Sequence, residues 1–264
     1  MALIDIKLFS TSLLTNTDVR VVLPTPDEPF YSDDTPWYDR SKRYQVLYLL
    51  HGAHGDCTVW TRNTGIERYA QKYKIVVVSA SVTNSCYMDM AHGGKFFTYM
   101  TQELPRFIES VFSVSTRRED TFIAGMSMGG YGAFRLGLAQ PERYSCIVSL
   151  SGAIDITSGL ESRKTSIQME DVFGTLSQVG TDNDNLWKLE QLLKQGVQVP
   201  KIYQCCGTED FLYESNQVAR RKLEQLGVDF TYDEGPGIHN WDYWDPQIRK
   251  ILDWLPLKGT LVDV

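Results

Sequence analysis

The segment Gly125-Met126-Ser127-Met128-Gly129 places a serine between two glycines. A serine hydroxyl becomes a useful nucleophile when the backbone holds it exposed and a neighbouring base takes its proton. Glycines on both sides permit the sharp, strained turn that this requires, because they have no side chains to collide with adjacent elements. An apolar run precedes the motif and small residues follow it, so we predict a strand–turn–helix with Ser127 as nucleophile.

A histidine is the side chain best suited to accept the serine proton. The chain has four histidines, at His51, His54, His92 and His239. Where a serine occupies such a turn, the acid and then the base follow it in the chain, and His239 is the only histidine after Ser127. His239 lies in the glycine-rich segment 235–241, which we expect to be a loop at the carboxyl end of a strand. We predict His239 as the general base; the alternative is a surface histidine that stacks on Trp241.

A carboxylate should orient that histidine, and several lie between the serine and the histidine. Asp210 comes just after the apolar run 201–206, at the end of the expected penultimate strand. From there it could accept the ring proton of the base and stabilise the imidazolium. We predict Asp210 as the acid, with three competitors, Glu209, Asp155 and Asp233. The structural alternative for Asp210 is an acid that stabilises the start of the next helix.

The remaining requirement is a pair of donors for the oxyanion of a tetrahedral intermediate. The stretch 51–55 reads His-Gly-Ala-His-Gly and directly follows the apolar run 45–50. It is a shortened relative of the glycine-rich loops that supply one backbone donor in such sites. We predict the backbone N–H groups of Ala53 and Met128 as the oxyanion hole. The alternative is a plain glycine turn.

The segments that must position these residues alternate between short apolar runs and helical periodicity. We expect strands at 17–24, 45–50, 74–79, 120–125, 144–150, 201–206 and 228–233, and helices at 97–112, 131–139, 214–226 and 242–255. Runs that are apolar on both faces indicate parallel strands covered by helices on each side. The alternation therefore predicts an α/β fold with a mostly parallel central sheet and helices on both faces.

The domain organisation follows from the same alternation of predicted strands and helices. Residues 156–199 fit the alternation poorly, and we expect them to form a small cap inserted between sheet elements. The proline-containing stretch 25–43 is expected to be a surface loop. No composition break suggests a second domain, so residues 1–264 are predicted to form one domain.

Composition excludes several classes of function. The net charge of −7 disfavours binding to nucleic acid and to anionic membrane surfaces. No segment approaches the length of about 20 apolar residues that a membrane helix needs. The five cysteines form no CxxC pair, so we expect neither a zinc site nor a cofactor. Their odd number, together with a start that lacks a signal-peptide pattern, favours reduced thiols in the cytoplasm.

Longer stretches of the chain resemble a known family. Residues 46–52, 99–108, 123–133, 150–155 and 239–244 are similar to segments of the esterase D-like group of α/β-hydrolases, and above all to bacterial tributyrin esterases. The resemblance implies the α/β-hydrolase fold and a cofactor-free serine carboxylesterase that acts on short-chain acyl esters, from acetyl to butyryl, or on aryl esters. It also implies that the acid stands at Asp210, and it makes a homo-oligomer plausible.

Two alternatives accompany this reading. The same triad could serve a thioesterase of the S-formylglutathione hydrolase kind or an acyltransferase, although the sequence after the oxyanion strand differs from that of S-formylglutathione hydrolases. The fold could also act as an inactive binding module, but all three triad residues are in place. The expected partner is a small-molecule ester.

Overall fold

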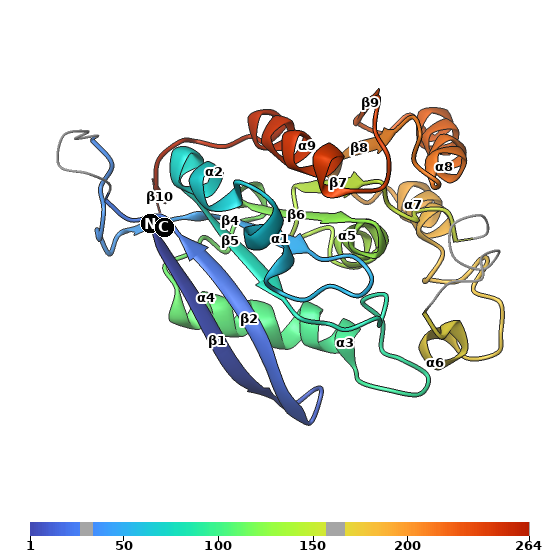
Figure 1. Ribbon diagram of the computed structural model, residues 1–264, viewed down its shortest axis with the longest axis horizontal. Helices are drawn as coiled ribbons and strands as arrows, with labels where there is room; N and C mark the ends of the chain where they lie inside the picture. Colours follow the sequence, from blue (N-terminus) through green and yellow to red (C-terminus); the bar gives the residue numbers. More distant parts are fainter. Residues whose placement is uncertain (27–33, 157–166, 264) are drawn as a thin grey trace.

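The computed structural model describes residues 1–26, 34–156 and 167–263. The strands of its main sheet are β1 (Ala2–Ser10), β2 (Thr15–Leu23), β4 (Gln45–Leu50), β5 (Ile75–Ala80), β6 (Thr121–Met126), β7 (Cys146–Leu150), β8 (Lys201–Gly207) and β9 (Phe230–Gly235). They lie side by side in the order β1-β2-β5-β4-β6-β7-β8-β9 (Figure 1). A separate two-stranded sheet joins β3 (Lys42–Arg43) to β10 (Val262–Asp263).

The direction of the strands confirms the predicted mostly parallel sheet. β4 to β9 pair with one another in parallel, whereas β1 and β2 are antiparallel to their neighbours. In a parallel sheet every strand ends at the same edge, so residues that follow different strands meet there. Ser127, Asp210 and His239 follow β6, β8 and β9, which brings them to one edge.

Helices cover both faces of the sheet (Figure 1). One face carries α1 (Val59–Asn63), α2 (Ile66–Tyr73) and α9 (Trp241–Trp254). The other carries α3 (Phe96–Thr98), the π-helix η1 (Tyr99–Glu103), α4 (Leu104–Val111), α5 (Met128–Ala139), α7 (Asn185–Lys194) and α8 (Tyr213–Leu226). A short 3₁₀ turn, η2 (Arg118–Asp120), leads into β6. None of the helices in the described residues is long and apolar enough to cross a membrane.

Strand β4 shows why these apolar runs form central strands. Successive side chains on a strand point to opposite faces. Leu47 and Leu49 pack into the core beneath α9, while Tyr48 and Leu50 pack into the core beneath α5. All six residues of β4 are buried, so the strand has no solvent-facing side and needs no polar alternation.

The predicted cap, 156–199, is described only in part. Residues 157–166 lie outside the described residues; α6 (Met169–Phe173) and α7 follow them. α7 contacts α5 and α8 and leads into β8, which is the position of a crossover helix between parallel strands. Backbone hydrogen bonds from Ala91 and His92 hold the carboxyl half of α6. That this region forms a cap stays a prediction.

The single helix expected at 97–112 is interrupted by a π-helical turn. Pro105 has no N–H group and cannot bond the carbonyl of Thr101, four residues earlier. That carbonyl accepts a hydrogen bond of 3.1 Å from Nε2 of Gln140 instead. The π-helical turn η1 ends two residues before Pro105, and the helix then continues as the ordinary α-helix α4.

The π-helix also fastens the turn between β1 and β2. The carboxylate of Glu103 accepts hydrogen bonds from Oγ of Ser10 at 2.7 Å and from the backbone amides of Thr11 and Ser12 at 2.8 and 3.0 Å. These donors lie more than 90 residues away in the chain. The hairpin is therefore anchored to the helical layer at its tip.

Candidate active site

Ser127 occupies a strained turn between β6 and α5. Its backbone φ of 55° and ψ of −120° lie in a region that residues with a Cβ rarely adopt. A Cβ on Gly125 would lie 2.2 Å from the carbonyl oxygen of Gly129, so a side chain at position 125 does not fit. A Cβ on Gly129 would in turn meet the carbonyl oxygens of Leu50 and His51 at 2.6 Å. The two glycines of the motif thus allow the turn to form.

The structure brings together the three residues predicted as a triad. Nε2 of His239 lies 2.8 Å from Oγ of Ser127, within hydrogen-bonding distance. The other ring nitrogen, Nδ1, lies 2.8 and 3.0 Å from the two carboxylate oxygens of Asp210. The Asp210 side chain is fully buried, and that of His239 is 14% exposed. This chain of contacts can carry a proton from the hydroxyl to the imidazole while the carboxylate balances the imidazolium charge.

The competing carboxylates have other partners. Asp233 contacts Nζ of Lys250 at 2.9 Å and the hydroxyl of Tyr203. Asp155 is buried beyond the end of β7, and within the described residues it makes none of the hydrogen bonds of the His239 ring. Asp210 also accepts a hydrogen bond of 2.8 Å from the amide of Leu212, just ahead of α8. The helix-start role considered for it is thus present as well.

Two aromatic side chains pack against the histidine, and neither was predicted. The ring centroid of Phe211 lies 4.3 Å from that of His239, and Trp244 approaches the imidazole edge-on at 4.9 Å. Nε1 of Trp244 donates to Oγ of Ser151 at 3.1 Å, which fixes the indole. Trp241, on which His239 would stack in the alternative to the base role, contacts Trp60 and Trp244. The sequence signal that could have indicated this contact is Trp244, which lies five residues after His239.

The loop after β4 lies directly against the serine turn. A Cβ on Gly52 would meet the side chains of Met126 at 2.6 Å and Ser127 at 3.2 Å. Ala53 follows Gly52 in this loop. Met128 is the first residue of α5, where N–H groups have no carbonyl partner within the helix. Both amides predicted as oxyanion donors are therefore in elements that meet at Ser127.

His51 positions this loop rather than facing the serine. Its ring is buried, with Nδ1 2.7 Å from the carbonyl of Gly52, while Nε2 accepts from the amide of Val82 at 3.1 Å. Burial lowers the pKa of His51, which favours the neutral ring that can make both contacts. The hydroxyl of Tyr87 donates to the backbone carbonyl of His51 at 2.8 Å.

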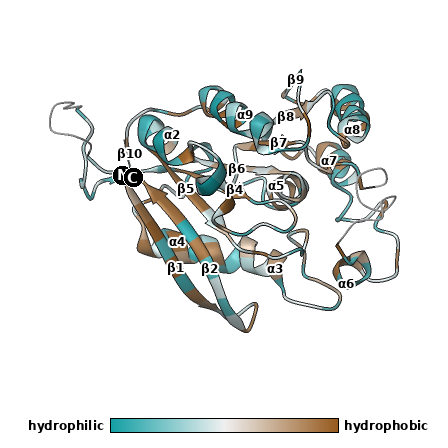
Figure 2. Cartoon of the chain, viewed as in Figure 1, coloured by the Kyte–Doolittle hydropathy of each residue, from teal (hydrophilic) through white to brown (hydrophobic). Residues whose placement is uncertain are grey.

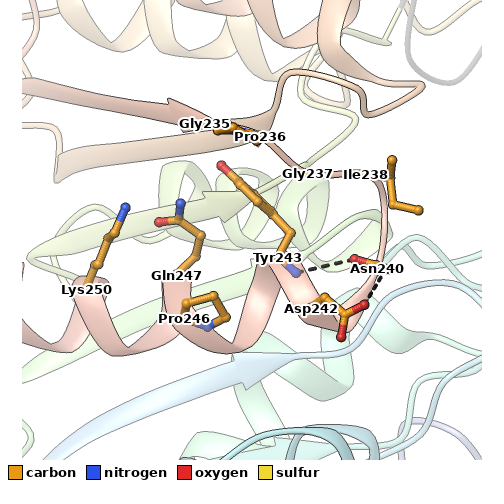
Figure 3. Close-up of a pocket in the computed structure, with 10 residues that line it drawn as sticks. All are labelled: Gly235, Pro236, Gly237, Ile238, Asn240, Asp242, Tyr243, Pro246, Gln247 and Lys250. Atoms are coloured by element: carbon orange, nitrogen blue, oxygen red, sulfur yellow. Dashed lines mark hydrogen bonds between the residues drawn. The ribbon is translucent and has the colours of Figure 1, made fainter.

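A pocket of about 540 Å³ lies between residues 235–240 and α9 (Figure 3). Figure 3 shows Tyr243, Gln247 and Lys250 projecting from α9 toward the loop. Neither Ser127 nor Asp210 nor His239 lines this pocket. We therefore do not place the reacting ester there.

Comparison with known proteins decides the family. The model of the Esterase family matches residues 10–255. The chain belongs to the Esterase family. An acetyl esterase of Caldicellulosiruptor saccharolyticus is 34% identical to this esterase, over 97% of this chain and 98% of the relative. The predicted family resemblance and the assignment as a serine ester hydrolase are thereby confirmed.

Solved structures support the same conclusion for the fold. The fluorophosphonate-binding serine hydrolase F of Staphylococcus aureus, solved with substrate bound, superposes on the esterase with a TM-score of 0.87, at 32% identity, covering 96% of this chain and 98% of the other. The S-formylglutathione hydrolase of the same organism gives a TM-score of 0.83, with the same identity and coverage. The α/β-hydrolase fold is confirmed.

Glu209 is placed to hold the loop that presents the histidine. Its carboxylate accepts a hydrogen bond of 2.5 Å from the amide of Gly237, and its own amide donates to the Gly237 carbonyl at 3.0 Å. The hydrogen bond from Gly237 lowers the pKa of Glu209, so the carboxylate keeps its charge in mild acid. In the esterase, Glu209 thus holds Gly237, which lies two residues before His239.

We expect Glu209→Ala to lower kcat by about tenfold, because a loosened loop misplaces the imidazole relative to Ser127. Glu209→Gln, whose amide oxygen can still accept from Gly237, should stay within about threefold of the parent. Steady-state kinetics and the melting temperature of both variants are to be compared. A loss that appears only in the melting temperature, with kcat unchanged in Glu209→Ala, would contradict a positioning role.

Proposed function

We propose that this serine esterase hydrolyses short-chain acyl esters, from acetyl to butyryl, or aryl esters, through an acyl-enzyme on Ser127. The observation that supports this most directly is the continuous chain of contacts Ser127–His239–Asp210 at 2.8 Å each. The acetyl esterase relative supports the short acyl group.

In the proposed first half-reaction, Oγ of Ser127 attacks the acyl carbon while Nε2 of His239 takes its proton. Asp210 accepts the Nδ1–H hydrogen bond, which fixes the tautomer and stabilises the imidazolium. The backbone N–H groups of Ala53 and Met128 stabilise the oxyanion. When the tetrahedral intermediate collapses, His239 gives the proton to the leaving alcohol and the acyl group remains on Ser127.

Water then reverses the sequence. His239 removes a proton from a water molecule while the water oxygen attacks the acyl carbon on Ser127. His239 then returns that proton to Oγ of Ser127 as the carboxylic acid product leaves. Both half-reactions transfer only an acyl group and protons, without a change of oxidation state. The triad and the two oxyanion donors are therefore sufficient for the proposed hydrolysis.

A thioester is the second candidate for the substrate. The likeness to the S-formylglutathione hydrolase favours it, because sulfur and oxygen leaving groups use the same triad chemistry. An acyltransferase would need a site that holds a second acceptor and excludes water. We treat the thioesterase and the acyltransferase as alternatives for the same acyl-enzyme.

The experiment is a panel of p-nitrophenyl and aryl esters of graded acyl length, together with S-formylglutathione, assayed on purified protein. We expect kcat/KM to be greatest within the acetyl-to-butyryl range or for an aryl acyl group. Faster turnover of S-formylglutathione than of any oxygen ester would favour the thioesterase. Transfer of the acyl group to an added alcohol in preference to water would favour the transferase, and failure of every substrate would favour a binding module.

The proposed mechanism needs no metal ion or organic cofactor. Within the described residues, no group of three His, Cys, Asp or Glu side chains is arranged to hold a metal ion. Esterase activity should therefore survive dialysis against EDTA with less than a twofold change. A loss that a single added metal restores would contradict this mechanism.

We also propose that the protein works in the cytoplasm and forms a homo-oligomer. All five cysteines are free and buried, which suits a compartment that keeps thiols reduced. The first strand of the sheet leaves a long edge to which a second copy could pair. Localisation of a tagged chain and the mass in solution test the two proposals separately.

A further inference from the structure

The outer edge of β1 is a long strand edge at the end of the main sheet. β1 has nine residues and pairs with β2 residue by residue, without a bulge. Its sequence contains no proline, and Lys7 is its only lysine. In Figure 1 the β1–β2 hairpin projects obliquely, with β1 as its outer margin. Bulges, prolines and several lysines are the devices that prevent a strand edge from pairing with another chain, and β1 has almost none of them.

The two faces of β1 have different characters. Ile4, Ile6 and Leu8 are half-buried and pack against the core of the molecule. On the opposite face Leu3 and Phe9 are 41% and 58% exposed. Hydrophobic residues run along the hairpin in Figure 2, interrupted by hydrophilic ones. A strand that continued the sheet beyond β1 would place its own side chains beside the apolar ones on both faces.

We propose that a second copy of this chain pairs with this edge, β1 antiparallel to β1, about a two-fold axis that passes through Ile6. The inference rests on the proposed homo-oligomer and names its interface. Ile6 is the middle residue of β1, so this register gives every residue of the strand a partner. Ala2 lies opposite Ser10 of the second copy, and the two sheets become one continuous sheet.

The charges on the strand match this register. Within one chain, Asp5 lies opposite Arg20 of β2 and Lys7 lies opposite Asp18, and both pairs form ion pairs. Across the proposed axis Asp5 lies opposite Lys7 of the second copy. The result is a row of alternating charges across four strands, Arg20–Asp5–Lys7–Asp18, with the last two from the second copy. Opposite charges on facing residues stabilise a sheet.

The apolar residues match as well. Leu3 lies opposite Phe9 of the second copy on the exposed face, and Ile4 lies opposite Leu8 of the second copy on the half-buried face. Both are pairs of directly facing hydrophobic side chains, which contribute to sheet stability. The contacts occur twice, because the axis repeats each of them.

Other two-fold registers are less favourable. A two-fold axis perpendicular to the sheet pairs residues whose side chains lie on the same face. Because side chains alternate between the faces along a strand, such an axis must be centred on a residue and not between two residues. An axis through Asp5 places two aspartates face to face, and an axis through Lys7 places two lysines face to face. Both shifts also leave residues at the strand ends without partners. The register centred on Ile6 alone combines full overlap with opposite charges at positions 5 and 7.

Charge reversal on one side of each pair provides the test. Asp5→Lys places lysine opposite lysine in the dimer, and Lys7→Asp places aspartate opposite aspartate. We expect each variant alone to dissociate about tenfold more readily than the parent, because two repulsive pairs replace two attractive ones. In an equimolar mixture, Lys at position 5 of one variant faces Asp at position 7 of the other. The mixture should therefore regain the parent mass as a heterodimer.

The measurement is sedimentation velocity over a wide range of protein concentration, with esterase activity as the check that each variant is folded. The parent should sediment as a dimer of twice 30.1 kDa. Asp182→Lys is the matched control, because Asp182 forms an ion pair with Lys188 of α7, outside the β1–β2 hairpin; it should leave the dimer unchanged. Ile6→Cys adds a register check, since a residue on the axis faces its own copy and should form an intermolecular disulfide on mild oxidation.

The outcomes separate the two levels of the proposal. A parent that stays monomeric overturns both the homo-oligomer and this interface. A dimeric parent whose mass is unaffected by Asp5→Lys and Lys7→Asp overturns the interface and keeps the homo-oligomer. Masses that grow continuously with concentration overturn the two-fold register, because they indicate head-to-tail pairing of β1 with another edge.

Discussion

Replacing Ser127 by alanine should lower kcat by about 10⁶-fold, to the level that the remaining groups support without a nucleophile. The fold should survive, because alanine and serine differ by one oxygen atom and meet the same backbone strain at a φ of 55°. An organophosphonate probe should add its mass to the parent protein at Ser127 and abolish turnover. The same probe should leave Ser127→Ala unlabelled.

Ser151 provides the matched control for this experiment. It also has a positive φ, of 48°, and it lies at the end of β7, but its hydroxyl contacts Trp244 rather than the imidazole. Ser151→Ala should retain the label and most of the activity. A label on a residue other than Ser127, or full turnover in Ser127→Ala, would show that the nucleophile has been misassigned.

The second large effect is expected at Asp210. Asp210→Asn should lower kcat by about 10⁴-fold, because an amide can hold the ring of His239 in the wrong tautomer. This loss corresponds to about 5 kcal/mol of transition-state stabilisation. The amide oxygen of asparagine can still accept from the amide of Leu212, so the melting temperature should change little. Steady-state kinetics and thermal unfolding are measured on the same preparation.

Asp233→Asn and Asp155→Asn are the controls for the acid. Asp233 pairs with Lys250 of α9, and within the described residues neither Asp233 nor Asp155 makes a hydrogen bond to the His239 ring. Each should cost less than tenfold in kcat. If Asp210→Asn lowers only the melting temperature while one of the controls abolishes turnover, the acid is the control residue and Asp210 serves the start of α8.

The sequence was sufficient for the central strands and for the residues that follow them. β4 begins and ends where the apolar run predicts, because a strand buried on both faces has a continuous hydrophobic signal. The structure brings the side chains of Ser127, Asp210 and His239 into contact, and their roles as nucleophile, acid and base stay a prediction. The choice between Asp210 and Glu209 rested on topology and resemblance, since local sequence does not show which of two adjacent side chains turns toward the imidazole.

Other features depend on contacts that the sequence does not display. β1 was not predicted, because Asp5 and Lys7 interrupt its apolar residues and the strand is only half-buried. α5 begins at Met128, earlier than the predicted 131, although Gly129 and Gly130 are poor helix formers. Close packing against neighbouring backbone, which larger residues would prevent, outweighs that propensity. The carbonyl of Thr101 in the π-helical turn accepts its hydrogen bond from Gln140, which lies 39 residues along the chain.

The anchoring of the β1–β2 turn by Glu103 makes one part of the sheet sensitive to acid. Burial raises the pKa of Glu103, but the hydrogen bonds from Ser12, Ser10 and Thr11 outweigh it and bring the pKa to about 2, from an ordinary value of 4.5. The stabilisation by this carboxylate is therefore complete above pH 4.5 and is lost as the pH falls toward 2. The hairpin tip should open locally in acid before the sheet unfolds, and amide hydrogen exchange at the turn would report it. Proton concentration thus governs the attachment of the sheet's outer edge independently of the stability of its centre.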